Sequence, residues 1–126
     1  MGQATEEEYA EKEINFRETV QPGRGTRITQ FWHLAGKVTQ VLFHFPPGCA
    51  GLVEMRLLKD EQPFYPVVGF LALDNSTPVH NLGDGIEYYA KEPLTVEILN
   101  HDGINPHTPT VTVTVKFKRP WWDKSG

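Results

Sequence analysis

The sequence predicts an all-β protein, an antiparallel β-sandwich of the jelly-roll type. Residues 110–118 (TVTVTVKFK) alternate polar and apolar without a break, as a strand with one buried and one exposed face does. Seven to nine short segments of this kind recur at intervals of roughly 8–12 residues, a spacing typical of sandwiches and barrels. Ten prolines and eleven glycines punctuate them, which fits a chain that turns often.

The first half of the chain contains four of these segments. Pro22-Gly23 predicts the first turn, because proline presets one dihedral angle and glycine supplies positive φ. Pro46-Pro47 ends the third segment, since proline cannot donate to a ladder. The predicted strands are 14–20, 26–34 (with Ile28, Trp32 and Leu34 on one side), 37–45 (Val41, Phe43 and Phe45 inward) and 52–58 (Val53, Met55 and Leu57 inward).

The second half is less regular. Residues 59–62 predict a hairpin turn, and Pro66 places the following strand at a sheet edge. Gly83-Asp84-Gly85 predicts a turn, whereas residues 70–73 fit either a strand or one helical turn. The predicted strands are 64–68, 77–80, 86–90, 93–100 (Leu94, Val96 and Ile98 inward) and 110–118.

The irregular connections favour a jelly roll of two four-stranded sheets over a simple meander. An immunoglobulin-like sandwich is the alternative, and the single Cys49 excludes its disulfide-bonded version. At 126 residues the chain is one domain by length. We expect a flexible acidic arm over residues 1–12, a single sandwich domain over 13–118 and a tail over 119–126.

The net charge of −4 argues against a nucleic-acid partner, because no long basic run is present to neutralise phosphates. No stretch approaches the roughly 18–20 apolar residues of a membrane span, so no membrane partner is expected. The N-terminus is acidic and lacks the apolar core of a signal peptide. We therefore expect synthesis in the cytoplasm, with the virion surface as one destination. A single cysteine fits a reducing interior, although a virion or secreted protein without disulfides has the same composition.

A metal site is one chemistry that the histidines suggest. His101, Asp102 and His107 lie close in sequence, but no His-x-His pair exists, so no metal or cofactor is predicted. Instead, Asn100, Asp102 and Asn105 are expected to shape the turn, as such side chains do by bonding nearby backbone. A structural calcium is a weaker alternative, with oxygen-rich loops at Asp74-Asn75-Ser76, Asp84 and Asp102.

No catalytic residues are predicted, and the chain is expected not to be an enzyme. The one base close to Cys49 in sequence is His44. The His44 side chain should point to the face opposite Phe43 and Phe45, and two prolines separate it from Cys49, so it is not placed to activate the thiol. Glu54 and Glu97 lie on outward strand faces, where a glycosidase cleft is one interpretation and solvation the simpler one. Nucleophile-elbow, phosphate-loop and dinucleotide motifs are missing from the sequence.

Aromatic residues are the stronger indication of function. Several occupy positions where alternation would expose them, and exposed aromatics mark recognition surfaces. Trp121-Trp122 follows the final predicted strand, so the pair either folds back on its own domain or docks on a neighbouring chain. The candidate contact residues are Trp32, Tyr88, Tyr89, Trp121 and Trp122.

The segment 38–49 (VTQVLFHFPPGC), the hairpin that follows it and the final Val-Thr run together resemble small jelly-roll accessory proteins of virus particles. These include decoration and spike-base proteins of tailed phages and archaeal viruses. The resemblance covers about residues 14–118 and implies a non-enzymatic homo-oligomer, a trimer first, that is bound to a capsid. It also implies that the acidic arm and the Arg119–Trp122 tail make contacts between subunits.

Two alternatives belong to other functional classes. A carbohydrate-binding module would stack sugars on Trp32, Tyr88 and Tyr89 across one concave sheet face. A cupin-like small-molecule enzyme would need His44, His80, His101 or His107 to converge inside the barrel. The placement of these side chains distinguishes the three interpretations.

Overall fold

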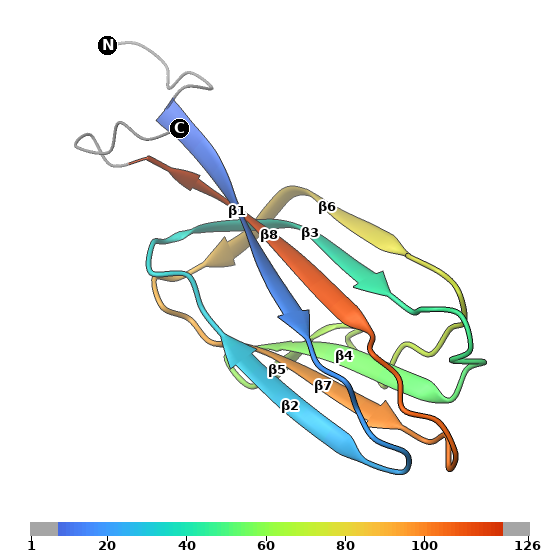
Figure 1. Ribbon diagram of the computed structural model, residues 1–126. Helices are drawn as coiled ribbons and strands as arrows, with labels where there is room; N and C mark the ends of the chain where they lie inside the picture. Colours follow the sequence, from blue (N-terminus) through green and yellow to red (C-terminus); the bar gives the residue numbers. More distant parts are fainter. Residues whose placement is uncertain (1–7, 120–126) are drawn as a thin grey trace.

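The computed structural model describes residues 8–119, which form eight β-strands and no α-helix (Figure 1). None of these described residues belongs to a helix long and apolar enough to cross a membrane. The strands are β1 (Tyr9–Arg17), β2 (Gly25–Gln30), β3 (Gly36–His44), β4 (Val53–Lys59), β5 (Gln62–Tyr65), β6 (Val79–Tyr88), β7 (Leu94–Asn100) and β8 (Thr110–Lys118).

The strands form two four-stranded antiparallel sheets, in the orders β1-β8-β3-β6 and β2-β7-β4-β5. Consecutive strands mostly cross from one sheet to the other, and β4–β5 is the one hairpin within a sheet among residues 8–119. Interleaved sheets of this order are the jelly-roll arrangement. The predicted fold class is therefore confirmed, and β5 lies at a sheet edge as Pro66 indicated.

The core lies between the two sheets and is built from the alternating faces that the sequence showed. Val111, Val113 and Val115 of β8 are fully buried, opposite β1 on one side and β3 on the other. Each fully buried aliphatic or aromatic side chain contributes roughly 1.5–3 kcal/mol through the hydrophobic effect. The predicted inward residues of β3, β4 and β7 are buried as well: Val41, Phe43, Phe45, Val53, Met55, Leu57, Leu94, Val96 and Ile98.

Several strand boundaries differ from the prediction. β2 ends at Gln30 rather than at residue 34, β5 covers Gln62–Tyr65 rather than 64–68, and the predicted strands 77–80 and 86–90 are one strand, β6. β1 begins at Tyr9, so residues 9–12 belong to the first sheet rather than to an arm. β6 continues through the predicted turn at Gly83-Asp84-Gly85, but its register jumps there, with Asn81 opposite Gln40 and Ile86 opposite Val38. The glycines adopt positive φ in this bulge. The turn residues therefore interrupt the ladder without ending the strand.

The sandwich has two ends of different character (Figure 1). At one end lie Tyr9, Lys118 and the connections 31–35, 60–61 and 89–93; we call it the termini end. The opposite end carries the connections 18–24, 45–52, 66–78 and 101–109; we call it the loop end.

Candidate docking surface

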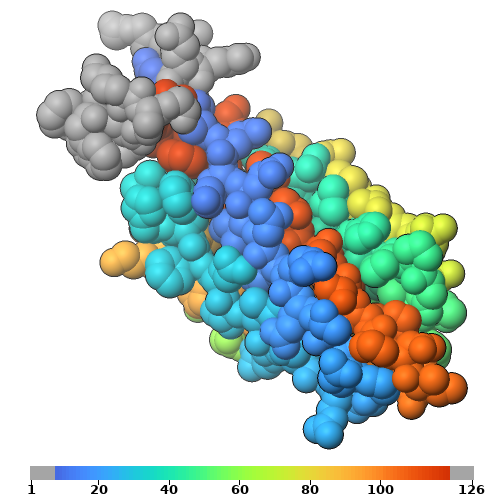
Figure 2. Space-filling view, in the orientation of Figure 1, coloured from blue at the N-terminus to red at the C-terminus, as the bar shows by residue number. Residues whose placement is uncertain are grey.

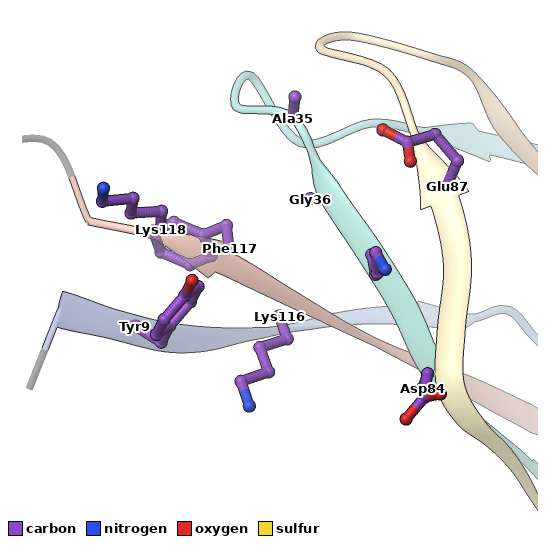
Figure 3. Close-up of a pocket in the computed structure, with 9 residues that line it drawn as sticks. Tyr9, Ala35, Gly36, Asp84, Glu87, Lys116, Phe117 and Lys118 are labelled. Atoms are coloured by element: carbon purple, nitrogen blue, oxygen red, sulfur yellow. The ribbon is translucent and has the colours of Figure 1, made fainter. Parts of the chain in front are cut away.

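A groove of about 590 Å³ opens at the termini end, on the outer face of the β1-β8-β3-β6 sheet. Figure 3 shows Tyr9, Lys116 and Lys118 from β1 and β8 on one side, and Asp84 and Glu87 from β6 on the other. The start of β3 lies between these two walls. The lining residues are Tyr9, Ala35, Gly36, Lys37, Asp84, Glu87, Lys116, Phe117 and Lys118.

Strand register explains why these residues meet. Lys37 pairs with Lys116 of β8 on one side and with Glu87 of β6 on the other, so the three side chains form a row across the sheet. Gly36 precedes this row, and a Cβ atom there would collide with the carbonyl oxygen of Lys116. Only glycine therefore permits this close approach of β3 to β8. Ala35 and Gly36 leave the start of β3 without large side chains, and Lys37 follows them between the two walls.

The groove carries charge of both signs. Lys118 Nζ lies 4.0 Å from Glu8 Oε2, and this is the one ion pair that its lysines form with residues 8–119. Lys116 Nζ lies 5.3 Å from the centre of the Tyr9 ring, within the range of a cation–π contact. Lys37 and Lys116 face each other across the ladder, and each also lies opposite an acidic residue, Glu87 and Glu11 respectively. An acidic group of a ligand would be a further partner for these lysines.

Two exposed aromatic side chains lie on the connections of the same end. Phe31 is 56% exposed and Tyr89 is 65% exposed. The two connections are tied together next to these rings, because Lys91 N–H donates to the carbonyl of Trp32 at 2.8 Å and Trp32 N–H donates to the Tyr88 hydroxyl at 2.7 Å. Figure 2 shows the connection 31–35 as a protruding part of this end. The exposed rings are therefore held on an ordered support.

The predicted contact residues have different placements. Tyr89 is exposed, as expected, whereas Tyr88 is fully buried and its hydroxyl donates to the Glu92 carbonyl at 2.7 Å. Burial also raises the pKa of Tyr88. The expectation that Tyr88 is exposed is wrong, because it is the last residue of β6 and points into the sandwich. Trp121 and Trp122 lie outside the described residues.

Trp32 is half-buried and belongs to the edge of the core. Its ring centre lies 5.3 Å from that of Phe117, and Lys12 Nζ lies 5.2 Å from the indole. The indole N–H has no hydrogen-bond partner within residues 8–119. Because Trp32 packs inward and Tyr88 is buried, these two and Tyr89 do not form the shared sugar-stacking face that a carbohydrate module requires.

Sequence reasoning missed Tyr9, Phe31 and Lys37. Tyr9 was assigned to the flexible arm, although the charged residues around it also fit the exposed face of a strand. Glu11 pairs in register with Lys116, so this acidic residue, which suggested a solvated arm, lies on the outer face of an edge strand. Charged side chains on an edge strand also protect it from pairing with other chains.

The cysteine has a different neighbour from the one considered in the sequence. Cys49 Sγ lies 3.9 Å from His107 Nδ1, and His107 Nε2 lies 2.9 Å from Asp102 Oδ2. Cys49 is fully buried, and burial, followed by the nearby Asp74 carboxylate, raises the pKa of its thiol. A reactive cysteine needs a lowered pKa and access to substrate. The arrangement therefore keeps Cys49 as a neutral thiol in the core.

The turn-shaping roles of the Asx side chains are confirmed. Asn100 Nδ2 donates to the carbonyls of Val20 and Asn105, both at 3.0 Å, and its Oδ1 accepts from the Asp102 N–H at 2.9 Å. Asp102 Oδ1 accepts from the Ile104 N–H at 2.9 Å. The bond from His107, followed by these backbone donors, lowers the pKa of Asp102 to about 2.

The other histidines and carboxylates engage separate partners. His44 bonds Thr77 at 2.8 Å, and His101 bonds Glu54 at 2.6 Å. His80 packs on Tyr65 with 3.9 Å between ring centres, and burial lowers its pKa. Glu97 pairs with Arg27 and Arg56. The histidines do not converge, as a cupin-like site would require, and no group of metal-ligating side chains gathers within residues 8–119.

The oxygen-rich loops proposed for calcium also have separate tasks. Asp74 Oδ1 accepts from the N–H groups of Gly48 and Ala50, at 3.0 and 2.9 Å. Asp84 lines the groove at the termini end, and Asp102 shapes the β7–β8 connection at the loop end. These three carboxylates hold different parts of the chain and do not share a site.

No family model matches this sequence, and no curated protein does either. Solved structures are similar to this chain. The major capsid protein P2 of bacteriophage PM2 is similar, with a TM-score of 0.56 and 13% identity over 94% of this chain and 47% of the P2 chain. This chain thus spans about half the length of P2. FlhE has a TM-score of 0.49 and 15% identity over 88% of this chain and 98% of its own. A turnip yellow mosaic virus structure has a TM-score of 0.39 and 12% identity, over 92% and 84%.

Proposed function

We propose that this chain is a non-enzymatic assembly protein, an oligomeric accessory protein that decorates a virus particle by binding protein subunits. The observation that carries the proposal is the termini end, where exposed Phe31 and Tyr89 accompany a charged groove. Aromatic side chains on an ordered support are typical of interface anchors. The fold shared with a phage major capsid protein supports the same reading at the level of architecture.

Self-association through the termini end is the first step of this proposal, with a trimer as the favoured state. Closed homo-oligomers are the usual outcome when a chain carries a patch that another copy can cover. The tail supplies a second apolar element, because Trp121-Trp122 follows the last strand in sequence. Two adjacent tryptophans have a much more favourable free energy when they are buried in an interface than when they are exposed to water.

Light scattering on the purified protein tests the proposal. The full chain should have a mass that is a multiple of 14.3 kDa. Deletion of residues 120–126, and separately the Phe31→Ser/Tyr89→Ser double variant, should lower that mass. Val67→Ser/Val68→Ser is the matched control, since these valines are 72% and 87% exposed at the loop end; its mass should not change. A full chain that scatters as a single copy would contradict the proposal.

A further inference from the structure

We propose that the groove at the termini end receives the tail, residues 120–126, of a second copy of this chain. The proposal rests on the assembly role above and deepens it by naming the occupant of the groove. Three observations lead to it: the composition of the groove, the composition of the tail, and the direction in which β8 leaves the sheet.

The groove combines uncharged residues with charges of both signs. Tyr9, Ala35, Gly36 and Phe117 are uncharged, whereas Lys37 of β3 lies between the two walls. Lysines line one wall, and Asp84 and Glu87 line the other (Figure 3). A matching ligand is a short peptide with an aromatic side chain next to charges of both signs.

The tail has this composition. Trp121-Trp122 supplies two large rings, and Asp123-Lys124 places an acid and a base directly after them. Asp123 would meet Lys37 and Lys116, neither of which forms an ion pair within residues 8–119. Lys124 would meet the Asp84 side of the groove. Seven residues in extended form reach about 25 Å, which is enough to enter a groove on a neighbouring subunit.

The geometry of β8 favours a second copy over the same chain. The Arg119 N–H donates to the Glu8 carbonyl at 2.6 Å, so the chain still runs beside β1 one residue past the strand. The groove is lined by residues 116–118, behind this point. Return to its own groove would require a reversal within the next two or three residues, whereas a neighbour's groove requires none.

A mixing experiment with two full-length variants tests the proposal. The tail variant is Trp121→Ser/Trp122→Ser, with an intact groove, and the groove variant is Asp84→Lys/Glu87→Lys, with an intact tail. Each alone should fall to the single-chain mass of 14.3 kDa in light scattering. Their mixture should regain association, because the tail of the groove variant fits the groove of the tail variant. Lys37→Glu in place of the double substitution gives a second groove variant.

The control carries the same charge change away from the groove. Glu18→Lys/Glu54→Lys replaces two carboxylates at the loop end and should keep the mass of the unaltered chain. If both variants lose association and their mixture does not regain it, tail and groove do not meet, and this inference fails while the assembly role stands. If the tail variant keeps the full mass, the inference also fails. A full chain that is a single copy overturns the assembly role itself.

Discussion

The two ends of the sandwich differ in whether their polar side chains are buried and hydrogen-bonded or exposed to water. At the loop end, the connections 18–24 and 101–109 are held by buried hydrogen bonds that centre on Asn100 and Asp102, and both side chains are almost inaccessible. At the termini end, charged and aromatic side chains stay exposed around a groove. Buried polar groups are costly unless each is paired. The loop end therefore contributes to stability, and the termini end is free to contribute to binding.

This contrast separates two kinds of substitution. A change at the loop end removes partners from groups that water cannot reach, so its cost appears in the free energy of unfolding. A change to an exposed side chain at the termini end removes a group that already contacts water, so its cost should appear only when a partner is present. The following predictions measure that separation.

Asn100→Ala should have the largest effect on stability. The substitution leaves the Asn105 carbonyl and the Asp102 N–H without their partner inside the loop end. It also removes one donor from the Val20 carbonyl, which keeps the His107 N–H. We expect a loss of about 2–4 kcal/mol in the free energy of unfolding, because each buried unsatisfied group costs about 1–3 kcal/mol. Urea unfolding measures this loss.

Asn81→Ala is the matched control for that experiment. Asn81 is exposed on the outer face of β6 and bonds only the Gln40 side chain among the described residues. Its loss should stay within about 0.5 kcal/mol, as for most surface substitutions. Equal losses for the two variants would contradict the claim that the loop end supplies the stabilising polar network.

Asp102 should make stability depend on acidic pH. Its pKa is lowered from 3.8 to about 2 in the folded chain. A lowered folded pKa means that the contribution is present above the unfolded pKa near 3.8 and is lost as pH falls through that value toward 2. Urea unfolding between pH 6 and pH 2 should show a shallower loss for Asp102→Asn, whose side chain does not titrate. An identical pH profile for both proteins would show that the His107 bond does not stabilise the ionised form.

The sequence predicted the jelly-roll class, the core faces and the roles of the loop-end Asx side chains. These features depend on local alternation and on turn chemistry, which neighbours in sequence determine. The sequence did not predict the Cys49–His107 contact, which joins two connections 58 residues apart. Nor did it predict the groove, since β1, β8, β3 and β6 meet there only through the crossing order of the sheets. Tyr88 lies on the opposite face of β6 from Glu87 and points into the sandwich, so the exposure expected for it is wrong.

Tyr88→Phe should have an intermediate effect, because it lies inside the termini end. The hydroxyl links the Trp32 N–H to the Glu92 carbonyl, and its removal leaves both without that partner. We expect a loss of about 1–2 kcal/mol in the free energy of unfolding. Measuring Tyr89→Phe beside it provides the comparison: the Tyr89 side chain is exposed, so its stability should hardly change. A larger loss for Tyr89→Phe would show that the hydroxyl of Tyr89, rather than that of Tyr88, stabilises the fold.

Phe31→Ser/Tyr89→Ser should have the smallest effect on the isolated fold and a clear effect on assembly. Both rings are mostly exposed, so the free energy of unfolding, measured under dilute conditions where subunits separate, should change by no more than about 0.5 kcal/mol. Under concentrated conditions, where oligomers form, the same variant should unfold at lower urea than the unaltered chain, because association stabilises the folded state by mass action. A variant that loses stability equally at both concentrations would place these rings in the fold. A stability difference that grows with protein concentration would place them in the interface.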